Sequence, residues 1–159
     1  MRIGYFIWEY PPRIIGGLGT YAENVCPAIL DLGHDISVFT MNDGTLKTRE
    51  ILKGIDVNRP MLVDGSNILP IFLTEDLRRW GMGIKFFNDV LIYNILSATK
   101  FVNELIKKEG YKFDIICAHD WLSAMAGIMI KQETGLPFVF HLHSTEWGRS
   151  LDGGSETVI

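Results

Sequence analysis

An apolar run, a loop rich in proline and glycine, and a helical pattern follow one another at the start of the chain. Residues 3–8 have the length and composition of a buried strand, and residues 9–19 form the loop. After the loop, apolar residues recur at spacings of three and four: Leu18, Tyr21, Ala22, Val25, Ile29 and Leu32. Glycines let backbone approach a ligand, and a helix start offers unpaired N–H groups and a positive dipole end. The order therefore predicts a site for a charged ligand, most often a phosphate.

Two other interpretations of this loop stay open. Gly17, Gly19 and Ala22 fit the loose dinucleotide fingerprint G-x-G-x-x-G/A, which would indicate a dinucleotide-binding oxidoreductase domain. That fingerprint places its first glycine in a tight turn directly after the strand, whereas residues 9–16 intervene here. The other alternative is a structural loop whose glycines only cap and turn the chain. We favour a phosphate-contacting loop of a different nucleotide-using enzyme.

Length and composition limit the class of protein further. The chain has 159 residues, 47% of them apolar, which is enough for a single hydrophobic core. A net charge of -4 gives no broad basic surface, so we expect no nucleic-acid partner. No apolar run approaches ~20 residues, which predicts no membrane span. The start shows no separate signal segment, and Cys26 and Cys117 are expected to be buried thiols rather than a disulfide; both features favour a cytoplasmic location.

The hydrophobic pattern predicts alternating strands and helices. Further strands are expected at residues 35–41, 55–58, 68–73, 114–118 and 137–141. Helices are expected at residues 18–32, 84–109 and 121–133, with a helical turn at 74–80, a short helix or coil at 46–53, and a helix start near 155–159. This order predicts one α/β domain, a Rossmann-like parallel sheet with helices on both faces. In such sheets, ligands bind at the carboxyl ends of the strands.

Three loops follow predicted strand ends and are rich in polar and aromatic residues: residues 9–17, 119–121 and 143–149. In the second loop, Asp120 can be the N-cap of the next helix, an acceptor for ligand hydroxyls, or both, and the indole of Trp121 can stack on a sugar ring. The third loop either is an ordinary solvated loop or suits a polyhydroxylated substrate through Glu146, Trp147 and Arg149. We expect the three loops to meet along one rim of the sheet.

Two histidines end the last predicted strand. His141 and His143 share a face if the strand persists, because the side-chain period of a strand is two. A metal site would use such a pair but needs one or two further ligands, for which His119 and Asp120 are candidates. Since nothing in the spacing requires that convergence, we predict no metal site. We expect one histidine to pack within the sheet and the other to reach the crevice.

Four segments of the chain stand in an order known from a family of enzymes. They are Tyr10-Pro11-Pro12 with Gly16-Gly17-Leu18-Gly19, then LGHDISV at residues 32–38, DIICAHDW at 114–121, and HSTEWGR at 143–149. Together they resemble the amino-terminal signature of GT-B glycosyltransferases, in the glycogen/starch synthase and related retaining families. One position departs from that signature: those synthases carry Lys-Thr before Gly-Gly-Leu, whereas Ile14 and Ile15 stand here, with Arg13 as the nearest cation.

The resemblance implies a two-domain enzyme that transfers a sugar, expected to be glucose, from a nucleotide-sugar to a glycan or other acceptor with retention of the anomeric configuration. Residues 1–159 would be the amino-terminal, acceptor-side domain. The carboxyl-terminal domain that binds the nucleotide-sugar is absent from this chain, so we expect the chain alone to be inactive. The expected donor is a UDP- or ADP-sugar, and no cofactor is expected. A non-catalytic carbohydrate-binding module is the alternative from another class.

The resemblance also implies roles for individual residues. The donor diphosphate is expected to approach Gly16, Gly17, Leu18 and Gly19. Asp120 and His143 are the predicted catalytic residues, which hold sugar hydroxyls near the reacting carbon. Acceptor contacts are expected from the polar and aromatic residues of the three loops: Glu9, Tyr10, His119, Trp121, Glu146, Trp147 and Arg149.

Overall fold

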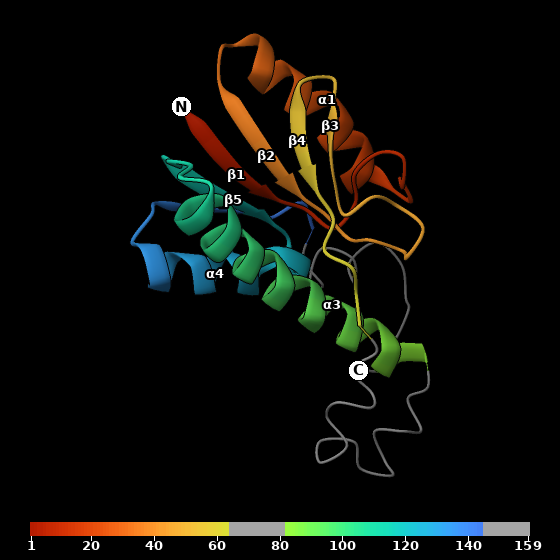
Figure 1. The fold of residues 1–159 in the computed structure, drawn as a ribbon. Coiled ribbons are helices and arrows are strands. Elements are labelled where there is room, and N and C mark those ends of the chain that lie inside the picture. Colours follow the sequence, from red (N-terminus) through yellow and green to blue (C-terminus); the bar gives the residue numbers. More distant parts are fainter. Residues whose placement is uncertain (64–81, 145–159) are drawn as a thin grey trace.

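A six-stranded sheet forms the centre of the computed structural model, which describes residues 1–63 and 82–144 (Figure 1). The spatial order of its strands is β3-β4-β2-β1-β5-β6. Five strands run parallel: β1 (Arg2–Phe6), β2 (Asp35–Phe39), β4 (Ile55–Asn58), β5 (Ile115–His119) and β6 (Phe138–His141). The edge strand β3 (Arg49–Leu52) pairs antiparallel with β4. The predicted Rossmann-like α/β class is confirmed.

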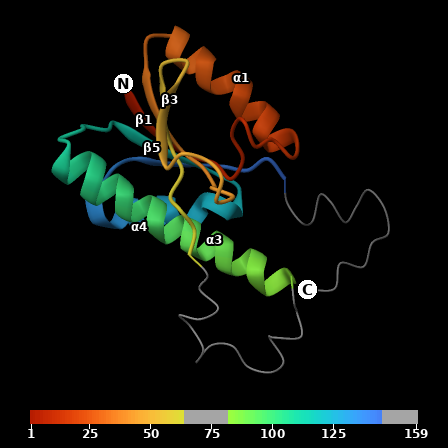
Figure 2. The same cartoon turned by 45° about the vertical axis from the view of Figure 1, so that its right-hand side comes forward.

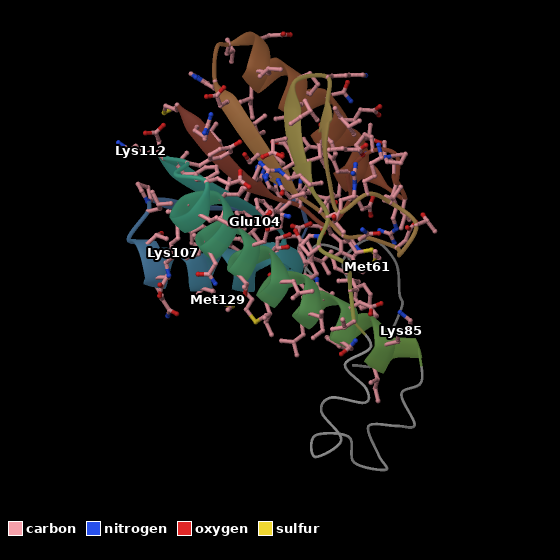
Figure 3. All side chains as sticks on the ribbon, in the orientation of Figure 1. Met61, Lys85, Glu104, Lys107, Lys112 and Met129 are labelled. Atoms are coloured by element: carbon pink, nitrogen blue, oxygen red, sulfur yellow. The ribbon has the colours of Figure 1, made fainter. Side chains whose placement is uncertain are left out.

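Helices cover both faces of this sheet, as two views of the ribbon show (Figures 1 and 2). One face carries α1 (Gly17–Asp31), and the other carries α3 (Met82–Thr99) and α4 (Trp121–Thr134). The single helix predicted for residues 84–109 continues beyond α3 as a π-helix (Lys100–Lys108), on which Figure 3 labels Glu104 and Lys107. An ion pair between Lys107 Nζ and Glu133 Oε1 at 3.1 Å joins this π-helix to α4. No helix within the described ranges is long and apolar enough to cross a bilayer.

Each face of the sheet has its own hydrophobic core, because successive side chains of a strand point to opposite faces. On the α1 side the core contains Tyr5, Ile7, Ala22, Cys26, Ile36, Val38, Ile55 and Val57. On the side of α3 and α4 it contains Phe6, Phe39, Phe101, Leu105, Ile116, Ala126 and Ile130. Both cysteines are free thiols, Cys26 buried and Cys117 half-buried. The central strand β1 contributes to both cores, through Tyr5 on one face and Phe6 on the other.

Gly4 allows the aromatic core to approach the central strand. A Cβ atom built at this position would lie 2.6 Å from Cε2 of Phe101 and 3.1 Å from Cγ2 of Ile116. The Phe101 ring in turn contacts the rings of Phe6 and Phe113, with centroids 5.4 Å and 4.3 Å away. The missing side chain thus leaves the space that this ring fills.

The edge strand β3 was not among the predicted strands. Residues 46–53 were expected to be a short helix or coil, whereas Arg49–Leu52 pairs with β4 through a turn in which Lys53 and Gly54 have φ values of 49° and 83°. The Arg49 guanidinium makes two contacts of 2.9 Å with the Asp56 carboxylate, which holds the two strands together. The strand expected at 68–73, the helical turn at 74–80 and the helix start at 155–159 lie outside the described residues.

Candidate active site

The three loops begin side by side at one rim of the sheet. In the parallel ladders, Phe6 of β1 pairs with Ala118 of β5, and His119 of β5 pairs with His141 of β6. The chain therefore leaves β1, β5 and β6 at adjacent points. Tyr21, in the first turns of helix α1, reaches the same rim. Its ring centroid lies 4.6 Å from that of His143, and its hydroxyl lies 3.5 Å from Nδ1 of His141. The expected meeting of the loops is thus observed for their described parts.

The glycine loop is held from within by Glu9. Its Oε2 accepts the backbone N–H groups of Ile15 at 3.0 Å and Gly16 at 2.9 Å. Gly19 makes room for this carboxylate, since a Cβ at position 19 would lie 3.0 Å from the same Oε2 and 3.0 Å from Cγ2 of Ile14. A Cβ built at Gly17 would meet nothing within 4 Å. Among the glycines predicted to contact phosphate, Gly19 therefore also has a packing role, whereas the space beside Gly17 is open.

Beneath this loop lies Arg59, a residue to which the sequence analysis gave no role. Its side chain is fully buried, donates from Nη2 to the Pro11 carbonyl at 2.8 Å, and pairs through Nη1 with Glu50 at 2.6 Å. The one sequence signal for Arg59 was its position directly after the strand predicted at residues 55–58, at the rim where sites form. In the loop itself, Tyr10, which was predicted to contact the acceptor, is only 5% exposed and packs in the core on the α1 side.

Asp120 ties the loop after β5 to the loop after β6. Its Oδ1 accepts the backbone N–H of His143 at 2.7 Å and that of Ser144 at 3.4 Å, and its own N–H donates to the His141 carbonyl at 2.9 Å. The residue precedes α4, yet its side chain makes no capping hydrogen bond. Its φ of 53° and ψ of 174° fall in a region that is nearly restricted to glycine. A strained backbone at a rim of the sheet is typical of a functional site.

Three histidines gather beside Asp120. Nδ1 of His119 shares a hydrogen bond of 2.8 Å with Nε2 of His143, and Nε2 of His119 lies 3.3 Å from Sγ of Cys117. The rings of His141 and His143 stack with centroids 4.2 Å apart. The buried histidine is thus His119, at the end of β5. The sequence analysis expected one of His141 and His143 to be packed within the sheet and the other to face the crevice.

Burial changes the protonation of this cluster. Burial, followed by the neighbouring rings of His143 and His141, lowers the pKa of His119 to about 3. Burial and His141 also lower the pKa of His143, although Asp120 opposes that shift. Burial raises the pKa of the Cys117 thiol to about 11. At neutral pH, His119 is therefore a neutral imidazole beside a protonated thiol, able to accept one hydrogen bond and donate another.

Aromatic side chains flank the rim at the start of α4. Trp121 is 44% exposed, and its ring lies 5.9 Å from that of Phe86 and 6.0 Å from that of Phe87, both on α3. This places an indole face at the surface, as a stacking role for Trp121 requires. The other predicted acceptor contacts, Glu146, Trp147 and Arg149, lie outside the described residues.

A cavity of about 580 Å³ opens at the same rim, between the end of β2 and the first turns of α3. Its polar lining includes Asn42, Asp43, Lys85 and Asp89. From sequence, residues 42–44 were expected to form only a turn, because Asn-Asp-Gly is a strong turn signal that hides any other role. Carboxylates and an amide around a space of this size can bind a hydroxyl-rich molecule.

Comparison with known proteins shows which sequences this chain is similar to. A family model described as the starch synthase catalytic domain matches residues 2–157. An uncharacterized glycosyltransferase of Methanocaldococcus jannaschii is 31% identical over 153 residues, which cover 94% of this chain and 32% of that protein. A glycogen synthase of Mycobacterium tuberculosis is 29% identical over 161 residues, which cover 94% of this chain and 35% of that protein. The chain therefore spans about a third of the length of these curated relatives.

A solved structure supports the fold. The catalytic domain of starch synthase IV from Arabidopsis thaliana, bound to ADP and acarbose, matches with a TM-score of 0.59 at 16% identity, covering 89% of this chain and 34% of that one. The likeness confirms the predicted GT-B type of sheet. Because the family model matches nearly every residue, the chain belongs to the family of the starch synthase catalytic domain.

Proposed function

We propose that this chain is the acceptor-side, amino-terminal domain of a retaining glycosyltransferase of the glycogen/starch synthase type. The enzyme transfers a sugar, glucose in this proposal, from a nucleotide-sugar to a glycan. One observation carries the proposal: the start of α1 and the pair Asp120 and His143 lie together at one rim, joined by the Tyr21 ring 4.6 Å from His143. A diphosphate and a sugar can therefore be bound by adjacent groups of one site.

The start of α1 is proposed to bind the donor diphosphate. The amides of Ile15 and Gly16 already donate to Glu9, so the groups left for phosphate are those of the first helical turn, Gly17, Leu18 and Gly19. These N–H groups and the helix dipole stabilise the negative charge that grows on the departing diphosphate. Arg13, next to the isoleucines that replace the family's Lys-Thr, is proposed to supply a cation here.

Asp120 and His143 are proposed to orient the sugar. Oδ1 of Asp120 is engaged by the two amides of the following loop, so a sugar hydroxyl would meet Oδ2. Positive charge develops on the donor sugar during transfer, and a fixed carboxylate nearby stabilises it. The imidazole of His143, held by Asp120, is proposed to hydrogen-bond a second hydroxyl. Most of the rate enhancement then comes from positioning.

The acceptor is proposed to occupy the cavity of about 580 Å³ beside β2 and α3, near the exposed indole of Trp121. The likeness to a starch synthase bound to ADP and acarbose supports an ADP-sugar donor and an oligosaccharide acceptor, with a UDP-sugar as the other donor to be tried. The nucleotide-binding domain is proposed to lie in the part of the relatives that this chain does not cover. We propose a cytoplasmic location, since both cysteines are free.

The test is an assay of the parent enzyme, containing this domain and the carboxyl-terminal one, with ADP-glucose or UDP-glucose and a maltooligosaccharide. Elongation with an α-linked product is expected, and Asp120→Asn and His143→Ala are expected to lower kcat at least ~100-fold, because they remove oriented polar groups. His34→Ala, at the far end of α1, is the control and should keep full activity. Oligosaccharide binding without transfer from any nucleotide-sugar would instead identify a carbohydrate-binding module.

A further inference from the structure

Three of the four histidines in the chain meet where β5 and β6 end. One nitrogen from each of His119, His141 and His143 lies within 4.8 Å of the other two. We propose that this histidine triad is a binding site for one divalent transition-metal ion of the Zn²⁺ class, with solvent as the fourth ligand. The proposed sugar transfer does not require such an ion, so the site is an additional property of the domain.

The backbone brings the triad together before any ion binds. His119 and His141 are partners in the parallel ladder between β5 and β6. His143 is held in place by Asp120, whose Oδ1 accepts its backbone N–H at 2.7 Å. Because strand pairing and this carboxylate fix all three positions, metal binding orders little additional chain. The Asp120 carboxylate also places a negative charge beside the cation.

The spacing of the nitrogens suits a tetrahedral ion. Zn²⁺ binds imidazole nitrogen at about 2.0–2.1 Å, which places neighbouring ligand nitrogens about 3.3 Å apart in a tetrahedron. Nδ1 of His119 lies 2.8 Å from Nε2 of His143, and the largest separation within the triad is 4.8 Å or less. The first distance is shorter than the ideal and the others do not exceed 4.8 Å, so side-chain rotations would bring the three nitrogens to tetrahedral positions. An all-imidazole set favours Zn²⁺, Ni²⁺ or Cu²⁺ over Mg²⁺ or Ca²⁺, which prefer oxygen.

A neighbouring group supports the required tautomer of His119. When Nδ1 binds the metal, the single ring proton of a neutral imidazole resides on Nε2. Sγ of Cys117 lies 3.3 Å from that nitrogen and can accept its hydrogen bond. Metal-binding histidines usually donate their second N–H to such an outer partner. A neutral imidazole keeps its one ring proton when its other nitrogen binds the metal.

Metal binding would have a consequence for catalysis, and this consequence alone rests on the proposed function. Nε2 of His143 cannot bind a metal ion and a sugar hydroxyl at the same time. A metal on the triad is therefore expected to inhibit transfer by the parent enzyme. The binding itself is independent of whether the parent transfers sugar.

Calorimetric titration of ZnCl₂ into the metal-free chain tests the site. We expect one Zn²⁺ per chain, and binding weakened ~100-fold or more in His141→Ala, because even outer partners of a metal site contribute 10–100-fold. His34→Ala removes the histidine outside the triad and should bind Zn²⁺ like the unaltered chain. Mg²⁺ should not bind at the triad. Co²⁺ should give the visible absorption of tetrahedral cobalt, and His141→Ala should abolish it.

Two results would overturn the proposal. The first is Zn²⁺ binding that survives unchanged in both His141→Ala and His143→Ala, with far-UV circular dichroism showing intact folds. The second is a chain that takes up less than one Zn²⁺ and gives no tetrahedral cobalt spectrum. Because neither readout depends on catalysis, an inactive parent enzyme would count against the proposed function and leave this proposal intact.

Discussion

Asp120 holds His143 through a hydrogen bond of 2.7 Å from the His143 backbone amide to Oδ1 of the Asp120 carboxylate. The bond links the loops that follow two neighbouring strands, and it fixes the histidine that also contacts His119. An aspartate that sequence analysis assigns either to a helix cap or to a ligand therefore has a third role. It shapes the site by positioning another side chain.

The free-energy cost of the strained backbone at Asp120 can be measured directly. At a φ of 53° and ψ of 174°, a residue with a Cβ costs about 1–3 kcal/mol. We expect Asp120→Ala to be less stable than Asp120→Gly by about 1 kcal/mol, although glycine is normally the more destabilising residue. Urea denaturation of both variants measures the difference. Equal stabilities, or a more stable alanine variant, would show that the backbone at this position is relaxed.

Glu9 is expected to stabilise the glycine loop. Glu9→Ala leaves the amides of Ile15 and Gly16 without their charged acceptor, and we expect a loss of about 1–3 kcal/mol in the free energy of unfolding. Glu23→Ala, an exposed glutamate on α1, is the matched control and should change stability by less than about 0.5 kcal/mol. Similar effects of both substitutions would argue against the role of Glu9 in the loop.

Gly4 provides a test of the core beneath the site. Gly4→Ala places a methyl group 2.6 Å from the Phe101 ring, and we expect overpacking to cost about 1–3 kcal/mol of unfolding free energy. Phe101→Leu should recover part of this loss in the double variant, which a double-mutant cycle in urea would reveal. Gly17→Ala, where the added atom meets nothing within 4 Å, should be nearly neutral. A double variant whose losses simply add would contradict the proposed contact.

The histidine cluster predicts how stability depends on pH. A histidine titrates near 6.5 in the unfolded chain, whereas burial and the neighbouring rings hold the pKa of His119 at about 3 in the folded one. Below pH 6.5 the unfolded state therefore binds a proton that the folded state does not. The contribution of His119 to the free energy of unfolding is therefore fully present above pH 6.5. It falls as the pH decreases, with a limiting slope of about 1.4 kcal/mol per pH unit for this group.

Urea unfolding between pH 7 and 5, with a chelator present, measures this slope before most carboxylates titrate. The lowered pKa of His143 acts in the same direction. His119→Gln should reduce the slope, and the part that remains is expected from His143. A slope as steep in His119→Gln as in the unaltered chain would assign the effect to other groups.

The order of strands and helices was predictable because hydrophobic periodicity records which faces are buried. The edge strand β3 was not, since its pairing depends on the Lys53–Gly54 turn and on the ion pair between Arg49 and Asp56 rather than on a strong local pattern. Likewise, the buried residues of the π-helix, Phe101, Val102 and Leu105, recur at the spacings of three and four that an α-helix also gives, so a periodic pattern cannot reveal it.

The sequence located the rim of the site but not the contacts along it. The resemblance to a known family singled out Asp120 and His143, and the structure brings them together. That Glu9 points back into its own loop, or that His119 meets His143, depends on loop geometry and on the register of β5 and β6. Neither can be deduced from spacing along the chain.

The fully buried guanidinium of Arg59 connects the edge strand β3 to the loop that precedes α1. It joins Glu50 on the outermost strand to the Pro11 carbonyl, and a cation with no access to water cannot exchange either partner for solvent without a large cost. The Pro11 carbonyl is thereby tied to the edge of the sheet farthest from the histidines. Substitution of Glu50 at that edge would therefore change the position of Pro11 and of the loop that leads to the proposed diphosphate site, while the overall architecture stays the same.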